Sequence, residues 1–169
     1  MEEIKNKVAE SGLITLSLDE YYPQGERKEL DLKPWLYEGF MLKEKDFRQS
    51  VKEHDWEQYQ NAYVAVFCSE DAIIPQWAYM LIGAQLAGKA LQVVYGSPQS
   101  LEVVLAQKAL ESFNAEAYRD KRVILKGCGD VPIPPQAYLQ FAALLQPVVK
   151  SLMFGEACST VPIYKKPRK

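Results

Sequence analysis

Short apolar runs rich in β-forming residues recur along the second part of the chain, with amphipathic segments of helical spacing between them. The predicted strands are residues 62–67, 91–95, 122–126 and 148–154. The predicted helices are residues 74–87, 97–112 and 134–145. Strands that are apolar on both faces and alternate with helices are typical of a parallel sheet covered on both sides. We therefore predict a three-layer α/β fold with a mostly parallel sheet of at least four strands.

The first 60 residues are less regular. Residues 2–11 could form a short helix that ends at Gly12. Residues 13–18 alternate between apolar and polar side chains, which predicts a half-buried strand, and Leu30 and Leu32 repeat this period, so the two segments could pair as a hairpin. A charged helix is expected over residues 43–53, with an apolar stripe on one face.

The length of 169 residues predicts a single domain. Within it we distinguish an N-terminal helix and hairpin extension of residues 1–60 and an α/β core of residues 61–164. Residues 165–169 (KKPRK) are basic, and five such residues at a chain end usually form a solvated tail.

Charge and hydropathy limit the partners. The chain has 20 Lys and Arg residues and 22 Asp and Glu residues, so its net charge is -2 and there is no basic excess for a nucleic-acid partner. No apolar run approaches the ~20 residues that span a bilayer, so no membrane partner is expected. The three cysteines cannot form a complete disulfide framework, which favours a reducing, cytoplasmic location.

All three cysteines follow predicted strands. Cys68 comes directly after the first, Cys128 after the third and Cys158 after the fourth, each with a proline and an isoleucine or valine downstream. The carboxyl ends of parallel strands meet at one sheet edge, where open α/β sheets bind ligands. Thiolates there could hold zinc or an iron–sulfur cluster. A fourth ligand could come from one of three other side chains: Asp71, Asp130 or His54.

Two other interpretations of the cysteines remain open. Cys68 or Cys128 could be the nucleophile of a thiol-dependent enzyme, since the predicted helix after Cys68 would favour its thiolate, and Asp71 is a third catalytic candidate. Ser69 and Asp71 are better explained as caps of that helix. The cysteines could also be ordinary core residues, because free cysteine packs as a small hydrophobe.

Aromatic residues are concentrated in a segment that has little regular pattern to bury them. They are Tyr21, Tyr22, Trp35, Tyr37 and Phe40. Such residues are enriched at subunit contacts, and a two-fold homodimer is the commonest oligomer. The same residues could instead cover one face of the sheet, so a homodimeric structural or interaction protein is a further possible function.

Five segments resemble a bacterial family known as domain of unknown function 2480. They are SGLITLSLDEYYPQGER, HDWEQYQ, WAYMLIGAQL, KGCGD and QPVVKSLMFGEACSTVPIYKK. The resemblance covers nearly the whole chain and implies a cytoplasmic bacterial protein that works alongside iron–sulfur assembly and sulfur-mobilising proteins. The first functional hypothesis is therefore a cysteine-lined site, at the carboxyl edge of the strands, that handles metal, iron–sulfur clusters or sulfur.

Overall fold

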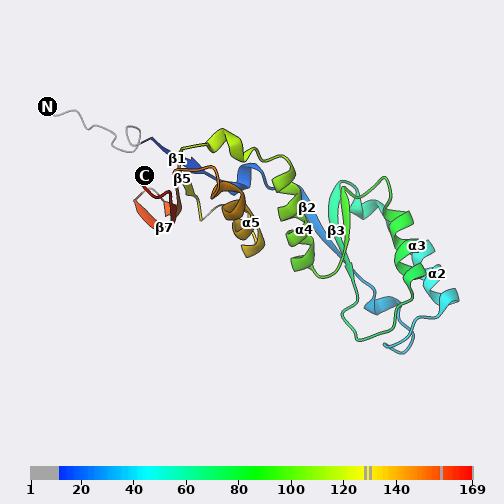
Figure 1. Cartoon of the computed structure of the whole chain (residues 1–169). Helices are drawn as coiled ribbons and strands as arrows, with labels where there is room; N and C mark the ends of the chain where they lie inside the picture. The colour runs from blue at the N-terminus through cyan, green and yellow to red at the C-terminus, as the bar shows by residue number, and fades with distance from the viewer. Residues whose placement is uncertain (1–11, 128, 130, 157, 169) are drawn as a thin grey trace. The chain divides into compact units, whose positions relative to one another are not determined.

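The computed structural model describes residues 12–127, 129, 131–156 and 158–168, which divide into two compact units (Figure 1). The central unit comprises residues 24–104, and the terminal unit comprises the described residues up to 23 and from 105 onward. Each unit contains its own sheet. The predicted helix of residues 2–11 lies outside the described residues.

The central unit is built on a three-stranded parallel sheet. Its strands are β2 (Glu26–Asp31), β3 (Ala62–Phe67) and β4 (Gln92–Tyr95), in the order β2-β3-β4. Its helices are α2 (Glu44–Glu53) and α3 (Gln76–Leu86), with single turns η2 (Lys33–Trp35) and η3 (Glu57–Tyr59). Five of the six β3 residues are buried, as expected for a middle strand that is covered on both faces.

Helices cover both faces of this sheet. On one face, Val64 and Val66 of β3 share a core with Phe47 of α2 and Ile82 of α3. On the other face, Arg27 stacks over the ring of Tyr63 and forms an ion pair with Glu102, 3.0 Å away, in the first part of α4 (Pro98–Glu111). The predicted α/β class with helices on both faces is confirmed here.

The terminal unit contains a four-stranded sheet of order β1-β5-β6-β7. Its strands are β1 (Leu13–Leu16), β5 (Arg122–Leu125), β6 (Ser151–Glu156) and β7 (Ser159–Lys165). The first three are parallel, and β7 returns antiparallel to β6. The remaining elements are the last part of α4, α5 (Pro135–Leu145), η1 (Leu18–Glu20) and η4 (Ala115–Tyr118). Phe141 and Leu145 of α5 are buried, as is Leu152 of β6.

The predicted elements are largely confirmed, but two predicted pairings are wrong. β1 pairs with β5 and β2 pairs with β3, so the expected N-terminal hairpin does not form. The four strands predicted for one sheet are divided, with β3 and β4 in the central unit and β5 and β6 in the terminal unit. Local hydrophobic patterns indicate a strand but not its neighbour, and sequential strands are adjacent only about two-thirds of the time. Whether the units act as the single domain that the length suggests stays a prediction.

The sequence does not predict strand β7, because Pro162 lies within it. Proline donates no backbone hydrogen bond, which argues against a central strand but is acceptable on an edge strand such as β7. Strand β6 begins at Ser151, three residues later than predicted. Among the described residues, no helix is long and apolar enough to cross a membrane.

We expect Phe47→Ala to destabilise the central unit by about 3–5 kcal/mol, the usual cost of truncating a fully buried phenylalanine. Phe47 has no exposed surface, and the centroid of its ring lies 5.6 Å from the ring centroid of Trp35 and 5.7 Å from that of Trp77. All three tryptophans of the chain lie in this unit, so tryptophan fluorescence during urea unfolding reports on it specifically.

Phe40→Ala is the matched control, because Phe40 is 53% exposed. Its effect should stay within about 1 kcal/mol, since exposed positions contribute little packing energy. Equal losses for the two variants would contradict the placement of α2 against the sheet.

Candidate functional site

A carboxylate connects the carboxyl ends of β2 and β3 in the central unit. Asp31 ends β2, and its Oδ2 accepts a hydrogen bond of 2.6 Å from the Ser69 hydroxyl. Its Oδ1 accepts hydrogen bonds of 3.0 Å from the backbone N–H groups of Ser69 and Lys33. These contacts fix the loop that carries Cys68, which directly follows β3.

Charges near this loop are balanced. Burial opposes ionisation of Asp31, but the hydrogen bonds from Ser69 and Lys33 outweigh it and hold the pKa of Asp31 below its usual value. Lys33 forms an ion pair with Glu70, which raises the pKa of Lys33. The loop therefore contains paired charges and a half-buried thiol, and its polar groups serve mainly to hold its shape.

The expected role of Ser69 and Asp71 as caps of α3 is wrong. Helix α3 begins at Gln76, with Pro75 in the capping position and no side-chain cap. A loop of seven residues separates this helix from Cys68, so Ser69 and Asp71 come too early in the chain to cap it. Ser69 bonds Asp31 instead, and Asp71 is exposed. The predicted effect of the helix end on the Cys68 thiolate loses its basis, since such effects fall off within one turn. Catalysis by Cys68, Cys128 or Asp71 stays a prediction.

A cavity of about 520 Å³ opens at the same end of the central sheet. It is lined by Ala72, Ile74, Gln76, Tyr79 and Tyr95. The rings of Tyr79 and Tyr95 meet edge to face with centroids 5.1 Å apart. Burial and the neighbouring Tyr95 raise the pKa of Tyr79 to about 12, so Tyr79 is a neutral hydrogen-bonding group at physiological pH. The cavity has no charged lining residue among those described.

The strands that precede the three cysteines belong to two sheets, so the prediction that these strands end at one sheet edge is wrong. Cys68 follows β3 of the central unit and is half-buried, whereas Cys158 lies exposed in the connection between β6 and β7 of the terminal unit. Cys128 and Asp130 lie outside the described residues. The described residues contain no group of three or more His, Cys, Asp or Glu side chains that could hold a metal ion. Zinc or an iron–sulfur cluster therefore stays a prediction.

His54, the sole histidine, lies in an aromatic setting rather than among metal ligands. Its Nε2 is 3.0 Å from the hydroxyl of Tyr59, and its ring centroid lies 4.7 Å from that of Trp56 and 5.1 Å from that of Trp35. Burial lowers the pKa of His54, against a smaller opposing effect of Asp55. The structure favours a packing role for this residue.

The aromatic residues proposed for a dimer contact have different environments. Tyr22 is buried, Tyr21 packs edge-on against Phe113 at 5.1 Å, and Trp35 packs against Phe47. Tyr37 and Phe40 remain exposed. A homodimer therefore stays a prediction, now resting on two residues rather than five.

A second and more strongly charged cavity lies in the terminal unit, at the edge where β5 and β6 begin. Its volume is about 580 Å³. Backbone pairing places Arg122, the first residue of β5, beside Ser151, the first residue of β6, and Ser151 opposite Lys165, the last residue of β7. Paired residues of neighbouring strands project from the same face of a sheet, so these three form one row, which we call the cation row.

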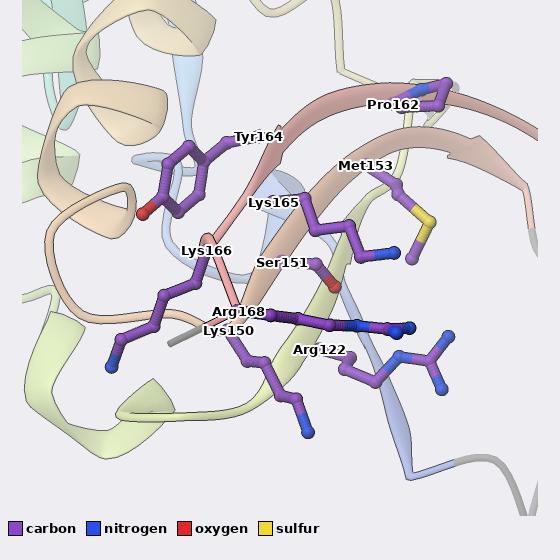
Figure 2. Close-up of a pocket in the computed structure, with 9 residues that line it drawn as sticks. All are labelled: Arg122, Lys150, Ser151, Met153, Pro162, Tyr164, Lys165, Lys166 and Arg168. Atoms are coloured by element: carbon purple, nitrogen blue, oxygen red, sulfur yellow. The ribbon is translucent and has the colours of Figure 1, made fainter.

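Three more cationic side chains line this cavity, together with four uncharged residues. The cations are Lys150, Lys166 and Arg168, and the other lining residues are Ser151, Met153, Pro162 and Tyr164. Figure 2 shows Arg122, Lys165 and Arg168 extending to one side of the strands and Lys166 pointing away from them. No carboxylate is among the described lining residues. We call this site the basic cavity.

One carboxylate stands at the margin of the basic cavity. Asp120 forms an ion pair of 3.0 Å with Lys166, and this contact holds the pKa of Asp120 below its usual value. Asp120 has a left-handed backbone conformation (φ 57°), and its N–H donates to the carbonyl of Val148. Asp120 thereby neutralises Lys166, one of the five cations that line the basic cavity.

The expectation that residues 165–169 are only a solvated tail is wrong for their first part. Lys165 ends β7, and the N–H of Lys166 donates a hydrogen bond of 2.9 Å to the carbonyl of Lys150. The clue in the sequence is that Arg122 begins one predicted strand and Lys150 lies near the beginning of another. Only the pairing of β7 with β6 brings these segments together.

The protein is of the α/β class. It has two units with mostly parallel sheets, and its terminal unit contains the basic cavity. The chain belongs to the family described as "Protein of unknown function (DUF2480)", whose model matches residues 2–166. This match confirms the resemblance noted from the sequence. No curated protein and no solved structure matches the chain.

We expect the stability of the central unit to fall as the pH is lowered from about 6.5, the ordinary value for histidine. Because the pKa of folded His54 lies below that value, the unfolded chain binds more protons in the interval between the two, and acidification favours unfolding there. Above the interval this contribution to stability is complete. Urea unfolding followed by fluorescence between about pH 5 and pH 7.5 measures the effect.

His54→Gln is the control, because it removes the only histidine and keeps a polar side chain beside Tyr59. Its unfolding midpoint should vary less with pH than that of the natural chain. An identical pH dependence in both proteins would show that His54 is not the responsible group.

Proposed function

We propose that this protein binds a small anionic ligand, with phosphate as the anionic group, in the basic cavity. The observation that carries the proposal is the cation row, in which backbone register places Arg122 and Lys165 on either side of Ser151. The pairing fixes the backbone positions of these residues on one face before a ligand arrives, so only their side chains must be ordered on binding. Preorganised charges bind better because less conformational entropy is lost.

Chemistry of the donors favours a phosphate group. Arginine offers a planar fork of N–H donors that matches phosphate oxygens, and lysine adds a compact charge. Ser151 contributes a hydroxyl at the centre of the row, which can donate to one further oxygen. A monocarboxylate would satisfy fewer of these donors. The volume of about 580 Å³ lies within the range of about 300–1,000 Å³ that is usual for small-molecule sites.

Isothermal titration calorimetry with inorganic phosphate tests this proposal. We expect saturable binding that weakens when the ionic strength rises from about 0.01 M to about 0.15 M, because the screening length shortens from about 30 Å to about 8 Å. Lys165→Gln and Arg168→Gln should each weaken binding about fivefold, or about 1 kcal/mol, as expected for the loss of one partly exposed charge contact.

Lys52→Gln is the matched control, since it removes the same charge from an exposed position of α2 in the central unit. It should leave phosphate affinity within about twofold of the natural chain, because it lies outside the basic cavity. Absence of saturable binding, or equal losses in all three variants, would refute the proposal in favour of nonspecific charge attraction.

Removing the carboxylate at the margin should have the opposite effect. Asp120→Asn frees Lys166 and removes a negative charge, so we expect phosphate binding to strengthen about two- to fivefold. Asparagine tolerates the left-handed backbone conformation of this position, which keeps the fold unchanged. The same calorimetric titration measures the change, and weaker binding by this variant would show that Asp120 helps to hold the ligand.

A further inference from the structure

An apolar row lies beside the cation row on the same face of the terminal sheet. Side chains two residues apart on a strand share a face, so Met153 lies on the face of Ser151. Register places Met153 beside Ile124 of β5 and opposite Pro162 of β7. The three residues Ile124, Met153 and Pro162 form what we call the apolar row.

A bulge in β7 brings Pro162 into this row. Leu152 pairs with Tyr164 but Met153 pairs with Pro162, which leaves Ile163 as the extra residue. Pro162 consequently lines the basic cavity, while Ile163 is 54% exposed and does not line it. Bulges commonly redirect side chains in this way near binding sites.

The basic cavity spans both rows. Met153 and Pro162 line it together with the cations, and Figure 2 shows Met153 on the same side of the strands as Lys165 and Arg168. Successive rows on one face of a strand are about 6.6 Å apart. A ligand that fills the cavity therefore meets positive charge at one end and apolar carbon and sulfur at the other.

We propose that the ligand is a soluble phosphate ester, with its phosphate on the cation row and its carbon body over Met153 and Pro162. This inference rests on the proposed function and specifies the second half of the ligand. An inorganic anion would leave Met153 and Pro162 uncovered and most of the 580 Å³ unused. The overall charge of -2 argues against an extended polyanion such as nucleic acid, which requires a wider basic surface.

A matched pair of probes separates the two halves of the ligand. At about pH 8 phenyl phosphate and inorganic phosphate are both mainly dianions, since a phosphate monoester loses its second proton at about pH 6 and inorganic phosphate at about pH 7, and they differ by an apolar ring. We expect phenyl phosphate to bind the full-length chain about tenfold more tightly, which equals about 1.4 kcal/mol. Covering about 55 Å² of apolar surface is sufficient for this gain.

Met153→Gln should remove most of this tenfold preference while leaving the affinity for inorganic phosphate within about twofold, because glutamine keeps the length of the side chain and exchanges an apolar contact for a polar one. Met80→Gln is the matched control, since Met80 is 74% exposed on α3 of the central unit. Pro162→Ala provides a second variant at an exposed position of the apolar row, in case Met153→Gln impairs folding, and it should reduce the preference about threefold.

The outcomes distinguish failure of this inference from failure of the proposed function. Equal affinity for the two probes, with Lys165→Gln weakening both, would overturn the phosphate ester and retain the anion site. No saturable binding of either probe would overturn both. Sedimentation with phosphatidylglycerol vesicles, but not with phosphatidylcholine vesicles, in the absence of phenyl phosphate binding would assign the basic cavity to a lipid surface and overturn a soluble ligand.

Discussion

Backbone hydrogen bonding around β5 is the constraint on which the terminal unit depends. β5 pairs with β1 on one side and β6 on the other, so residues 13–16, 122–125 and 151–154 must come into register. Each buried strand needs partners for its N–H and C=O groups, because unpaired backbone groups are costly away from water. Leu125 and Ile124 are buried as a result, and Arg122 is held at the exposed beginning of the strand.

The register of β5, β6 and β7 also brings positive charges together in the terminal unit. Arg122, Lys150 and Lys165 are distant in sequence, and the overall charge of the chain is slightly negative. The ladder of β5, β6 and β7 concentrates their charges in one cavity without a described carboxylate in its lining. Like charges held together raise the electrostatic free energy of the folded chain, and a bound anion relieves this repulsion. Asp120 neutralises Lys166 at the margin of the cavity.

Much of the fold could be predicted from local patterns. The β3 run AYVAVF, the helical stripe of α3 and the serine cap of α4 are each readable within a dozen residues, and the Ser100 N–H does bond the Ser97 hydroxyl. The candidate sites were far less accessible. Cys68 and Cys158 looked equivalent because each follows a strand, yet those strands belong to different sheets. The sequence predicts a solvated tail at Lys165, because Pro162 argues against a strand in the segment that forms β7.

By itself, the sequence determined the α/β class, most helices and strands, and the parallel direction of the strands joined by helices. These properties follow from the spacing of apolar side chains, which is a local feature. Only the tertiary structure decided which strands are neighbours, and therefore that the cation row exists and that the cysteine-bearing strands lie in separate units. Distant strands pair only if the favourable free energy of their contacts exceeds the entropic cost of closing the loop between them. No short segment of sequence contains both of these quantities.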